Sequence, residues 1–197
     1  MADVHGLCIC HFFLLLTWWA LKKNSGSIYR GKVIDLNLER VKLPNGFITE
    51  LEIIHHPGAA AIVPFIDADH VILIKQYRHA VGRYLYEIPA GKLFKTEGPL
   101  RCAKRELEEE IGYKAQRFQK LASIYTSPGF CNEITHIFSA THLVKSLQHL
   151  DPCEVLEVIE MPFRKVFQLI QKGKIQDAKS IIGLIIASWW KTHKLLK

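Results

Sequence analysis

The chain has 197 residues, of which 49% are apolar and 23% charged, and a formal net charge of +7. This length and balance exclude a disordered chain and predict one globular domain, with room for an added arm. The basic residues are scattered, and the sequence has no zinc-finger ligand pairs and no aromatic RNA-binding run. We therefore expect no nucleic-acid partner and interpret the charge as suited to a phosphorylated small molecule.

Residues 4–21 form an apolar run without Lys, Arg, Asp or Glu. The run lacks a basic start and a cleavage site, so it is a poor signal peptide, and it is slightly shorter than the ~20 residues that span a bilayer. Three interpretations stay open: a membrane anchor, an arm that packs on a partner subunit, or an upstream extension that is not translated. Membrane contact is not the favoured one. The five cysteines have no CxxC spacing, which suits a reducing compartment, and we expect a cytoplasmic protein.

Residues 24–27, "NSGS", have the composition of a linker, so we predict an extension and linker over residues 1–27. Apolar and polar residues alternate in 35–39 and again in 47–54, on either side of a Pro-Asn-Gly turn signal. This pattern predicts a two-stranded hairpin over residues 28–54. Because a lone hairpin is only marginally stable, we expect it to contact a second subunit.

Further strands are predicted where short apolar runs are bounded by turn residues. They cover residues 59–66, 71–78, 84–91, 118–125, 135–143 and 155–161. Two helices follow the last strand, one between Pro162 and Gly173 and one that begins at the N-cap Asp177. Many strands with segregated helices indicate an α+β fold with a layered, mixed β-sheet.

Four glutamates fall within residues 106–110, on a helix expected to start near Pro99 and to face the core through Leu100, Ala103, Leu107 and Ile111. Glu106, Glu109 and Glu110 share an adjacent flank, where their repulsion suits a site for Mg²⁺ or Mn²⁺. Arg105 can hold one of these carboxylates in place, and Glu108 is interpreted as solvated. A solvated acidic face without a metal is the alternative.

The same segment fits the Nudix box, G-x5-E-x7-R-E-U-x-E-E-x-G-U, in which U is a bulky apolar residue. The matching positions are Gly91, Glu97, Arg105, Glu106, Leu107, Glu109, Glu110 and Gly112, with Tyr113 as a looser last position. The chain thus resembles the Nudix hydrolase superfamily, which implies an α/β/α sandwich with a mixed β-sheet over residues 55–197. The loop departs from the pattern at Thr96, where relatives often carry Gly.

Other stretches are similar to the ADP-ribose pyrophosphatase branch of that superfamily. They are "EIPAGKL" before the box, "QYR" at 76–78, "SPGF" at 127–130 and "GKIQDAKSIIGL" at 173–184. The resemblance implies a homodimer that hydrolyses ADP-ribose or a related ADP-sugar to AMP and ribose 5-phosphate, with Mg²⁺ as cofactor and Mn²⁺ as a substitute. The alternatives are another nucleoside-diphosphate-sugar hydrolase, such as one acting on GDP-mannose, and a non-catalytic Nudix-fold protein that senses a nucleotide.

The resemblance also implies which residues hold the metal and carry the reaction. The metal ligands would be the Ala90 carbonyl, Glu106, Glu110 and Glu154, and the catalytic residues Glu154, Glu109, Glu110 and Arg105. Relatives commonly have a further glutamate where this chain has Pro152. We therefore expect Glu154 to orient the attacking water as well, with Asp151 as a weaker candidate. The alternative is that Glu154 is an exposed residue at the start of a strand.

Substrate contacts follow from the same resemblance. They fall on Arg78 for the diphosphate, on Ser127, Pro128, Gly129 and Glu133 for the terminal ribose side, and on Lys32, Val33 and Glu52 for an adenine pocket shared across the dimer. The alternatives are a surface arginine and an ordinary Ser-Pro-Gly turn. We interpret His55 and His56 as strand-end polar residues rather than as a general base.

Overall fold

The computed structural model describes residues 25–193, so the predictions for residues 4–21 lie outside the described part of the chain. Within it, no helix is long and apolar enough to cross a membrane. The chain divides into two compact units. Among the described residues, the smaller unit holds 25–56 together with Ser127–Asn132, and the larger unit holds Pro57–Thr126 and 133–193.

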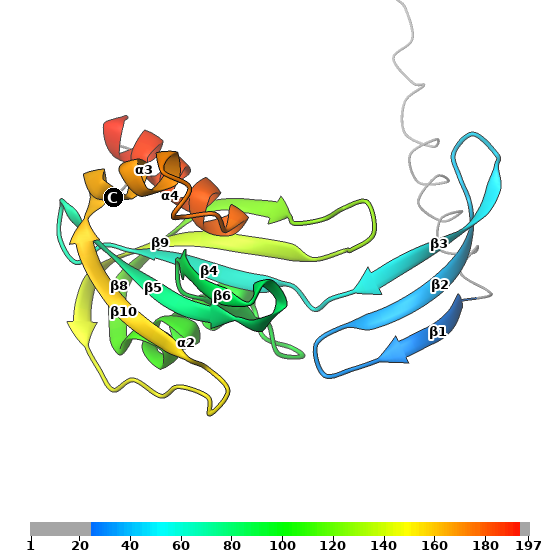
Figure 1. The fold of residues 1–197 in the computed structure, drawn as a ribbon, viewed down its shortest axis with the longest axis horizontal. Helices are drawn as coiled ribbons and strands as arrows, with labels where there is room; N and C mark the ends of the chain where they lie inside the picture. The colour runs from blue at the N-terminus through cyan, green and yellow to red at the C-terminus, as the bar shows by residue number, and fades with distance from the viewer. Residues whose placement is uncertain (1–24, 194–197) are drawn as a thin grey trace, which may run out of the picture. The chain divides into compact units, whose positions relative to one another are not determined.

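The smaller unit is an antiparallel sheet of three strands, β1 (Ser25–Arg30), β2 (Asp35–Lys42) and β3 (Ile48–His55), in that order (Figure 1). The hairpin of β2 and β3 confirms the two strands predicted within residues 28–54. The linker prediction was wrong for residues 25–27, because these pair with β2 from Ser25 opposite Glu39 onward. Pairing with a neighbouring strand overrides the weak strand preference of Ser and Gly.

Residues 127–132 attach to the end of β3 within the same unit. The Ile54 N–H donates to the Phe130 carbonyl at 2.7 Å, and the Asn132 N–H donates to the Ile54 carbonyl at 3.1 Å. The His55 ring lies between Glu39, 2.6 Å from Nε2, and the Asn132 side chain, 3.0 Å from Nδ1. Both ring nitrogens therefore have structural partners, as expected for a strand-end polar residue.

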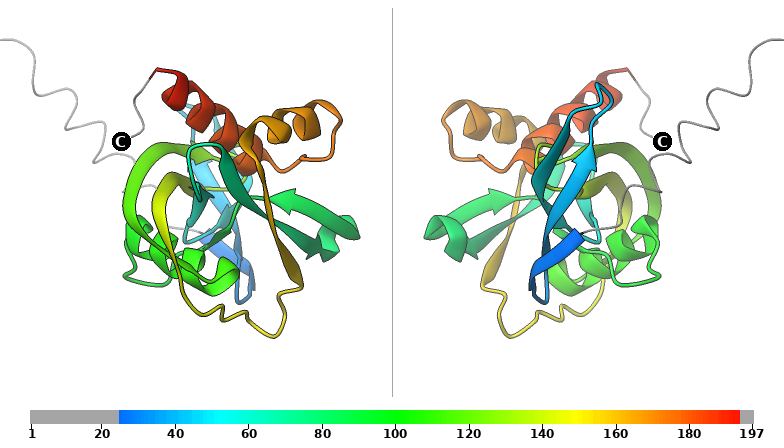
Figure 2. Two further views of the ribbon diagram at one scale, coloured as in Figure 1. Left: turned by 90° about the vertical axis from the view of Figure 1, so that its left-hand side faces the viewer. Right: turned by 90° about the vertical axis from the view of Figure 1, so that its right-hand side faces the viewer.

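The larger unit contains two further sheets. Their strands are β4 (Ala59–Pro64), β5 (His70–Arg78), β6 (Arg83–Glu87), β7 (Ala90–Lys92), β8 (Tyr113–Tyr125), β9 (Ile134–Lys145) and β10 (Leu156–Pro162). One sheet has the order β7-β4-β9-β8 and is mixed, because β4 and β9 run parallel. The other is antiparallel, with the order β10-β5-β6, and a 3₁₀ turn (His79–Val81) joins β5 to β6 (Figure 2). The single strand expected over 84–91 is thus two strands in different sheets.

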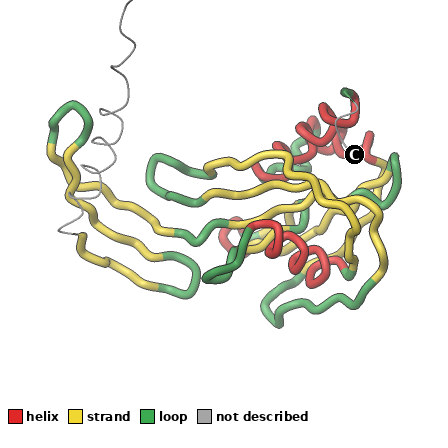
Figure 3. The backbone as a smooth tube through the Cα atoms, turned by 180° about the vertical axis from the view of Figure 1, so that it is seen from behind, coloured by secondary structure: helices red, strands yellow, loops and turns green. Residues whose placement is uncertain are grey.

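Three described helices accompany these sheets: α2 (Pro99–Ile111), α3 (Phe163–Gln171) and α4 (Ala178–Thr192) (Figure 3). α2 starts with a proline in its first turn and ends at Gly112, whose φ of 69° suits glycine. α4 begins at Asp177, which accepts a hydrogen bond from the Ser180 N–H and so confirms the predicted cap. One core prediction was wrong: Leu100 is 43% exposed, and core contact begins further along α2, at Cys102.

The core lies on both faces of the mixed sheet, because alternate residues of a strand point to opposite sides. Ala60 and Ile62 of β4 pack in one cluster with Leu107 of α2. Ala61 and Val63 pack in a second cluster with α3 and α4. The helices therefore cover opposite faces (Figure 1), which confirms the α/β/α sandwich predicted for this part of the chain.

Candidate active site

The acidic cluster forms where β7 runs into α2. β7 pairs with β4, opposite Ala59 to Ala61, and this pairing holds the backbone of Ala90 and Gly91 beside the helix. A Cβ added at Gly91 would lie 1.8 Å from a carboxylate oxygen of Glu106. Only glycine lets the backbone approach this carboxylate so closely, which explains the glycine that opens the motif.

Arg105 joins the carboxylates on the outer side of the cluster. Its guanidinium donates to both oxygens of Glu97 at 3.0 Å, to Glu106 at 2.6 Å and to Glu109 at 2.8 Å. Arg105 therefore holds three carboxylates rather than the one expected. The motif by itself assigns Glu97 no role. A hydrogen bond from Arg105 lowers the pKa of Glu97, so this glutamate is a charged anchor for the arginine.

Glu106 and Glu110 lie deeper, with 6% and 1% of their surface exposed. Glu110 accepts a hydrogen bond from the Ala90 N–H at 2.8 Å. Burial raises the pKa of Glu106 to about 7 although Arg105 opposes it. The pKa of Glu110 is raised well above its ordinary value by burial and by the charge of Glu106. Burial and mutual repulsion thus favour the neutral form of both carboxylates, and Arg105 offsets this only in part for Glu106.

Glu154 precedes β10 and is half-buried. Its carboxylate accepts a hydrogen bond from the Asp151 N–H at 3.0 Å, which closes a short turn. The negative charge of Glu154 is among the causes that raise the pKa of Glu106 and of Glu110, so it lies within electrostatic reach of both. In the described part of the chain, no three Asp, Glu, His or Cys side chains converge closely enough to hold an ion as they stand.

The donors present nevertheless fit a hard divalent cation. Carboxylate and carbonyl oxygens are the ligands that Mg²⁺ and Mn²⁺ prefer. The buried carboxylates Glu106 and Glu110 repel each other, and the backbone at Gly91 leaves room for no side chain between them and β7. Glu106 accepts a hydrogen bond from Arg105, and Glu110 accepts one from the Ala90 N–H.

Glu108 differs from the other glutamates of α2. It accepts a hydrogen bond from the Ser146 hydroxyl at 2.6 Å and pairs with Lys114 at 3.0 Å. The expectation that Glu108 is merely solvated was therefore wrong, because it fastens the helix to the end of the β8–β9 pair where β8 begins and β9 ends. Its role is structural and separate from the buried carboxylates.

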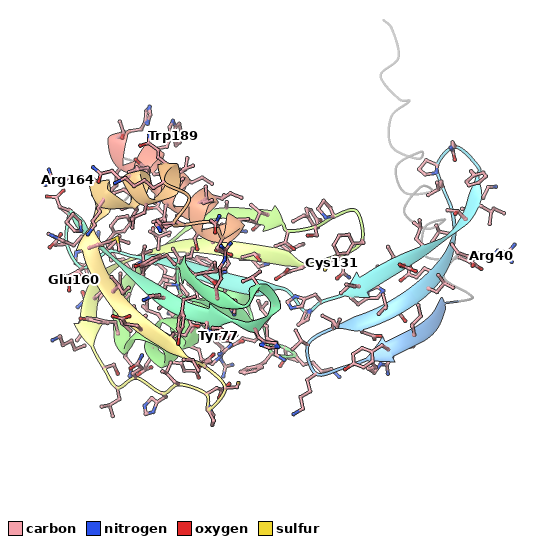
Figure 4. The ribbon with its side chains drawn as sticks, in the orientation of Figure 1. Arg40, Tyr77, Cys131, Glu160, Arg164 and Trp189 are labelled. Atoms are coloured by element: carbon pink, nitrogen blue, oxygen red, sulfur yellow. The ribbon has the colours of Figure 1, made fainter. Side chains whose placement is uncertain are left out.

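Arg78, the predicted diphosphate contact, ends β5 next to Tyr77, which Figure 4 labels. Its Nε and Nη2 atoms each donate to Glu87 at 2.7 Å. Glu87 is 1% exposed and also accepts a hydrogen bond from Lys179. Sequence reasoning missed Glu87, although an acidic residue inside the apolar run "YLYEIPA" could have indicated a buried ion pair.

The remaining predicted contacts fall in both units. Glu133 belongs to the larger unit and accepts a hydrogen bond from Thr126 at 2.8 Å. The smaller unit contains Ser127, Pro128, Gly129, Lys32, Val33 and Glu52. The Ser127 carbonyl accepts from the backbone N–H groups of Phe130 and Cys131, so this segment does form a tight turn. The structure brings Ala90, Glu106, Glu109, Glu110 and Arg105 together at α2.

Two further features lie in the larger unit. A pocket of about 750 Å³ opens along α2, and its lining includes Glu97, Arg105, Glu109 and His149. On β5, the side-chain carbonyl oxygen of Gln76 is buried and lacks a hydrogen-bond partner among the residues that the structure describes. An unpaired buried acceptor is uncommon and costs stability.

Comparison with known proteins identifies relatives along most of the chain. The NUDIX domain family matches residues 55–182. An "ADP-ribose pyrophosphatase" of Bacillus subtilis is 44% identical over 80% of this chain and 86% of its own length. A "Methanol dehydrogenase activator" of Bacillus methanolicus is 39% identical over the same shares. A "GDP-mannose pyrophosphatase" of Yersinia enterocolitica is 36% identical over 64% of this chain and 69% of its own length.

A solved structure resembles the fold as well. It is described as "Crystal structure of ADP compounds hydrolase" and superposes with a TM-score of 0.75, over 87% of this chain and 94% of the other. Its sequence is 23% identical, so the likeness concerns the fold alone.

Proposed function

The chain belongs to the NUDIX domain family, and on that premise we propose that it hydrolyses the diphosphate bond of ADP-ribose, or of a related ADP-sugar, to AMP and ribose 5-phosphate. One observation carries the proposal. Two carboxylates on α2, Glu106 and Glu110, are buried with raised pKa values beside a glycine that admits no side chain. Such an arrangement is costly for a solvated face and useful for binding a cation.

The proposed metal ligands are the Ala90 carbonyl, Glu106, Glu110 and Glu154. When bound, Mg²⁺ or Mn²⁺ would neutralise the diphosphate and polarise its phosphorus. Arg105 keeps Glu106 and Glu109 from moving apart through its hydrogen bonds to both. The electrostatic influence of Glu154 on the buried pair supports its place beside them.

Glu154 is also the proposed acceptor of the proton from the attacking water. Proline at position 152 has no side-chain acceptor, and the Asp151 backbone N–H already orients the Glu154 carboxylate. Loops that carry catalytic groups often close over substrate, so this carboxylate need not touch the cluster beforehand. We expect Glu154→Gln to lower kcat strongly with little change in substrate binding, and Asp151→Asn to cost much less. A larger loss from Asp151→Asn would overturn the assignment.

The substrate contacts are proposed as follows. Arg78 binds the diphosphate, because a guanidinium suits bidentate contact with phosphate oxygens. The terminal ribose lies against Ser127, Pro128, Gly129 and Glu133, and the adenine against Lys32, Val33 and Glu52.

A homodimer is part of the proposal. The strands and loops of the smaller unit expose Ile28, Tyr29, Val33, Phe47 and Ile48, each by more than half of its surface. A three-stranded sheet with this many exposed apolar side chains favours a covering partner. We expect a dimer in sedimentation at micromolar concentration, and a fully active monomer would rule it out.

Product analysis tests the reaction directly. The purified protein is incubated with ADP-ribose, other ADP-sugars and GDP-mannose, each with Mg²⁺, with Mn²⁺ and with EDTA. The proposal expects AMP and ribose 5-phosphate from ADP-ribose with either metal and no products with EDTA. Preferred cleavage of GDP-mannose would favour the second candidate, which the 36% identical relative supports. Binding without cleavage would favour a nucleotide sensor, against which the intact set of motif carboxylates argues.

A further inference from the structure

We propose that Glu87 and Lys179 are positioning residues that hold the Arg78 guanidinium in one orientation, with a free edge for the substrate diphosphate. This inference rests on the proposed role of Arg78 as the diphosphate contact. It assigns a function to a buried ion cluster that lies outside the acidic motif of α2.

Among residues 25–193, the hydrogen bonds of the Arg78 side chain lie along one edge of its guanidinium. Glu87 Oε1 accepts from Arg78 Nε and Glu87 Oε2 accepts from Nη2, both at 2.7 Å. A guanidinium has five N–H donors in a rigid plane. The bonds to Glu87 use the edge formed by Nε and Nη2, so the edge formed by Nη1 and Nη2 keeps two parallel N–H groups. That remaining edge matches two oxygens of a phosphate.

Glu87 cannot move to release the arginine, because other groups hold it. It is 1% exposed, and Lys179 donates to its Oε2 at 2.5 Å. Lys179 also donates to Asp177 at 2.9 Å. The first turn of α4 thus fastens the end of β6, where Glu87 is the last residue.

A second set of hydrogen bonds also joins the start of α4 to the end of β6. Asp177 accepts hydrogen bonds from the backbone N–H and the hydroxyl of Ser180. The Ser180 hydroxyl in turn accepts a hydrogen bond from the Ile88 N–H at 2.8 Å, in the residue after Glu87. The helix cap therefore fixes both the carboxylate and its backbone, which leaves the guanidinium little freedom.

The cluster is balanced in charge, with two carboxylates and two cations. Arg78 also interacts with Glu110 of the acidic cluster, whose charge contributes to the raised pKa of the arginine. The free edge therefore lies within electrostatic reach of the proposed metal ligands. A diphosphate held there would be presented to the carboxylates of α2.

Positioning of Arg78 and a purely electrostatic effect of Glu87 predict opposite changes in substrate binding when Glu87 is neutralised. Glu87→Gln removes a negative charge beside the substrate, which by charge alone would tighten binding of an anionic diphosphate. The substitution also places an amide NH₂ against the N–H donors of Arg78 or Lys179. Because misplacement of a binding group by about 1 Å can cost on the order of 100-fold, we expect kcat/KM to fall at least about tenfold.

A double-mutant cycle distinguishes positioning from a general loss of folding. Glu87→Gln, Arg78→Ala and the double variant are compared with the unaltered protein by kcat/KM, and by the Kd of ADP-ribose in EDTA, where no turnover occurs. If Glu87 acts through Arg78, its substitution costs about tenfold alone and less than about twofold in the Arg78→Ala background. An equal loss in both backgrounds would overturn the proposal.

Two further variants complete the test. Lys179→Met leaves the Arg78–Glu87 pair intact and should give a smaller loss, about threefold, that also vanishes without Arg78. If Glu87→Gln fails to fold, Lys179→Met replaces it in the double-mutant cycle. Glu157→Gln is the matched control, because this glutamate pairs with Lys75 in the same sheet but its side chain is 68% exposed. We expect no change from it.

The outcomes separate this inference from the proposed function. Failure of the unaltered protein to cleave any nucleoside diphosphate sugar would overturn the function, and the binding measurements would then carry the cycle. Unchanged binding and activity in Arg78→Ala would overturn the role of Arg78 and this inference together. Activity that depends on Arg78 but not on Glu87 would overturn the inference alone.

Discussion

Two glutamates of the larger unit are equally buried and electrostatically opposite. Glu87 and Glu110 are each 1% exposed. Burial alone would raise the pKa of Glu87, but hydrogen bonds from Arg78 and the charge of Lys179 lower it. Burial and the charge of Glu106 raise the pKa of Glu110, and a backbone hydrogen bond does not offset them.

The contrast shows what separates a buried charge that the protein neutralises itself from one that calls for a further cation. The Glu87 cluster contains its own cations and needs nothing further. The α2 cluster has more carboxylate charge than Arg105 neutralises, so its ionised form requires another cation. Burial alone does not determine whether the pKa of a glutamate is raised or lowered. The number of positive and negative groups around the carboxylate determines it in both clusters.

The largest expected effect comes from removing the unbalanced charge. Glu110→Gln preserves volume and should lower kcat by at least about 100-fold, because loss of a catalytic electrostatic group typically costs about 100- to 1,000-fold. Mg²⁺ affinity measured by calorimetry should fall with it. The free energy of unfolding without metal should stay the same or rise, since a buried charge is removed.

Glu108→Gln is the control for that experiment. This glutamate is on the same helix, but its partners are Ser146 and Lys114. We expect its kcat within about threefold of the unaltered protein, as is usual for a position without contact to the reacting groups. Near-normal turnover in a folded Glu110→Gln protein would refute the metal site.

The next effect is on the pH dependence of stability in EDTA. The pKa of Glu106 is raised from 4.5 to about 7, so the folded state binds more protons than the unfolded state between these values. Stability therefore falls as pH rises from 4.5 to 7, by roughly 3 kcal/mol at about 1.4 kcal/mol per pH unit. Glu106→Gln should reduce this slope, because the raised pKa of Glu110 contributes with the same sign and remains, and saturating Mg²⁺ should reverse it.

Glu87 should give the opposite behaviour. Its pKa lies below the ordinary value of 4.5, so its stabilising contribution is present above pH 4.5 and is lost as pH falls through the folded-state pKa. Glu87→Gln should flatten the acid limb and leave the slope above pH 4.5 unchanged. Urea titrations from pH 3 to 8 on both variants measure how the free energy of unfolding changes with pH. If Glu87 and Glu106 contributed slopes of the same sign, the proposed contrast between them would be wrong.

A smaller effect extends the contrast to an uncharged group. Gln76 is 6% exposed, and its side-chain oxygen lacks a partner in the described structure. Because an unsatisfied buried acceptor costs about 1–3 kcal/mol, Gln76→Met should raise the free energy of unfolding by about 1 kcal/mol. Gln171→Met, at an exposed position of α3, should change it by only a few tenths. A less stable Gln76→Met protein would mean that the amide is satisfied.

Sequence reasoning predicted the parts of the site that lie close together in the chain. The spacing of Glu106, Glu109 and Glu110 indicated one helical flank, and Gly91 and Arg105 were placed by the same motif. These positions depend on helix geometry and on one turn, both of which are local. The helix cap at Asp177 was predicted for the same reason.

The sequence did not predict contacts between distant segments. Glu87 and Lys179 are 92 residues apart and meet because the first turn of α4 lies at the end of β6. The third strand of the smaller unit was missed because "SGS" has weak strand preference and gains its order from β2. The structural roles of Glu97 and Glu108 likewise depend on partners that a single motif does not identify.

The smallest expected effect concerns the one position where the motif loop departs from its relatives. Thr96 has a φ of 75°, in the left-handed region that a β-branched residue rarely adopts. This conformation suits the glycine that the resemblance to the family leads us to expect at this position. The left-handed backbone destabilises a residue with a Cβ by about 1–2 kcal/mol, which glycine avoids. Glycine is also more flexible in the unfolded chain, which reduces this advantage by about 0.5–1 kcal/mol. Thr96→Gly should therefore stabilise the protein by roughly 0.5–1 kcal/mol, measured by urea unfolding. Thr96→Ala keeps the Cβ and should gain much less. An equal gain from alanine would show that the side chain, rather than the backbone, is strained.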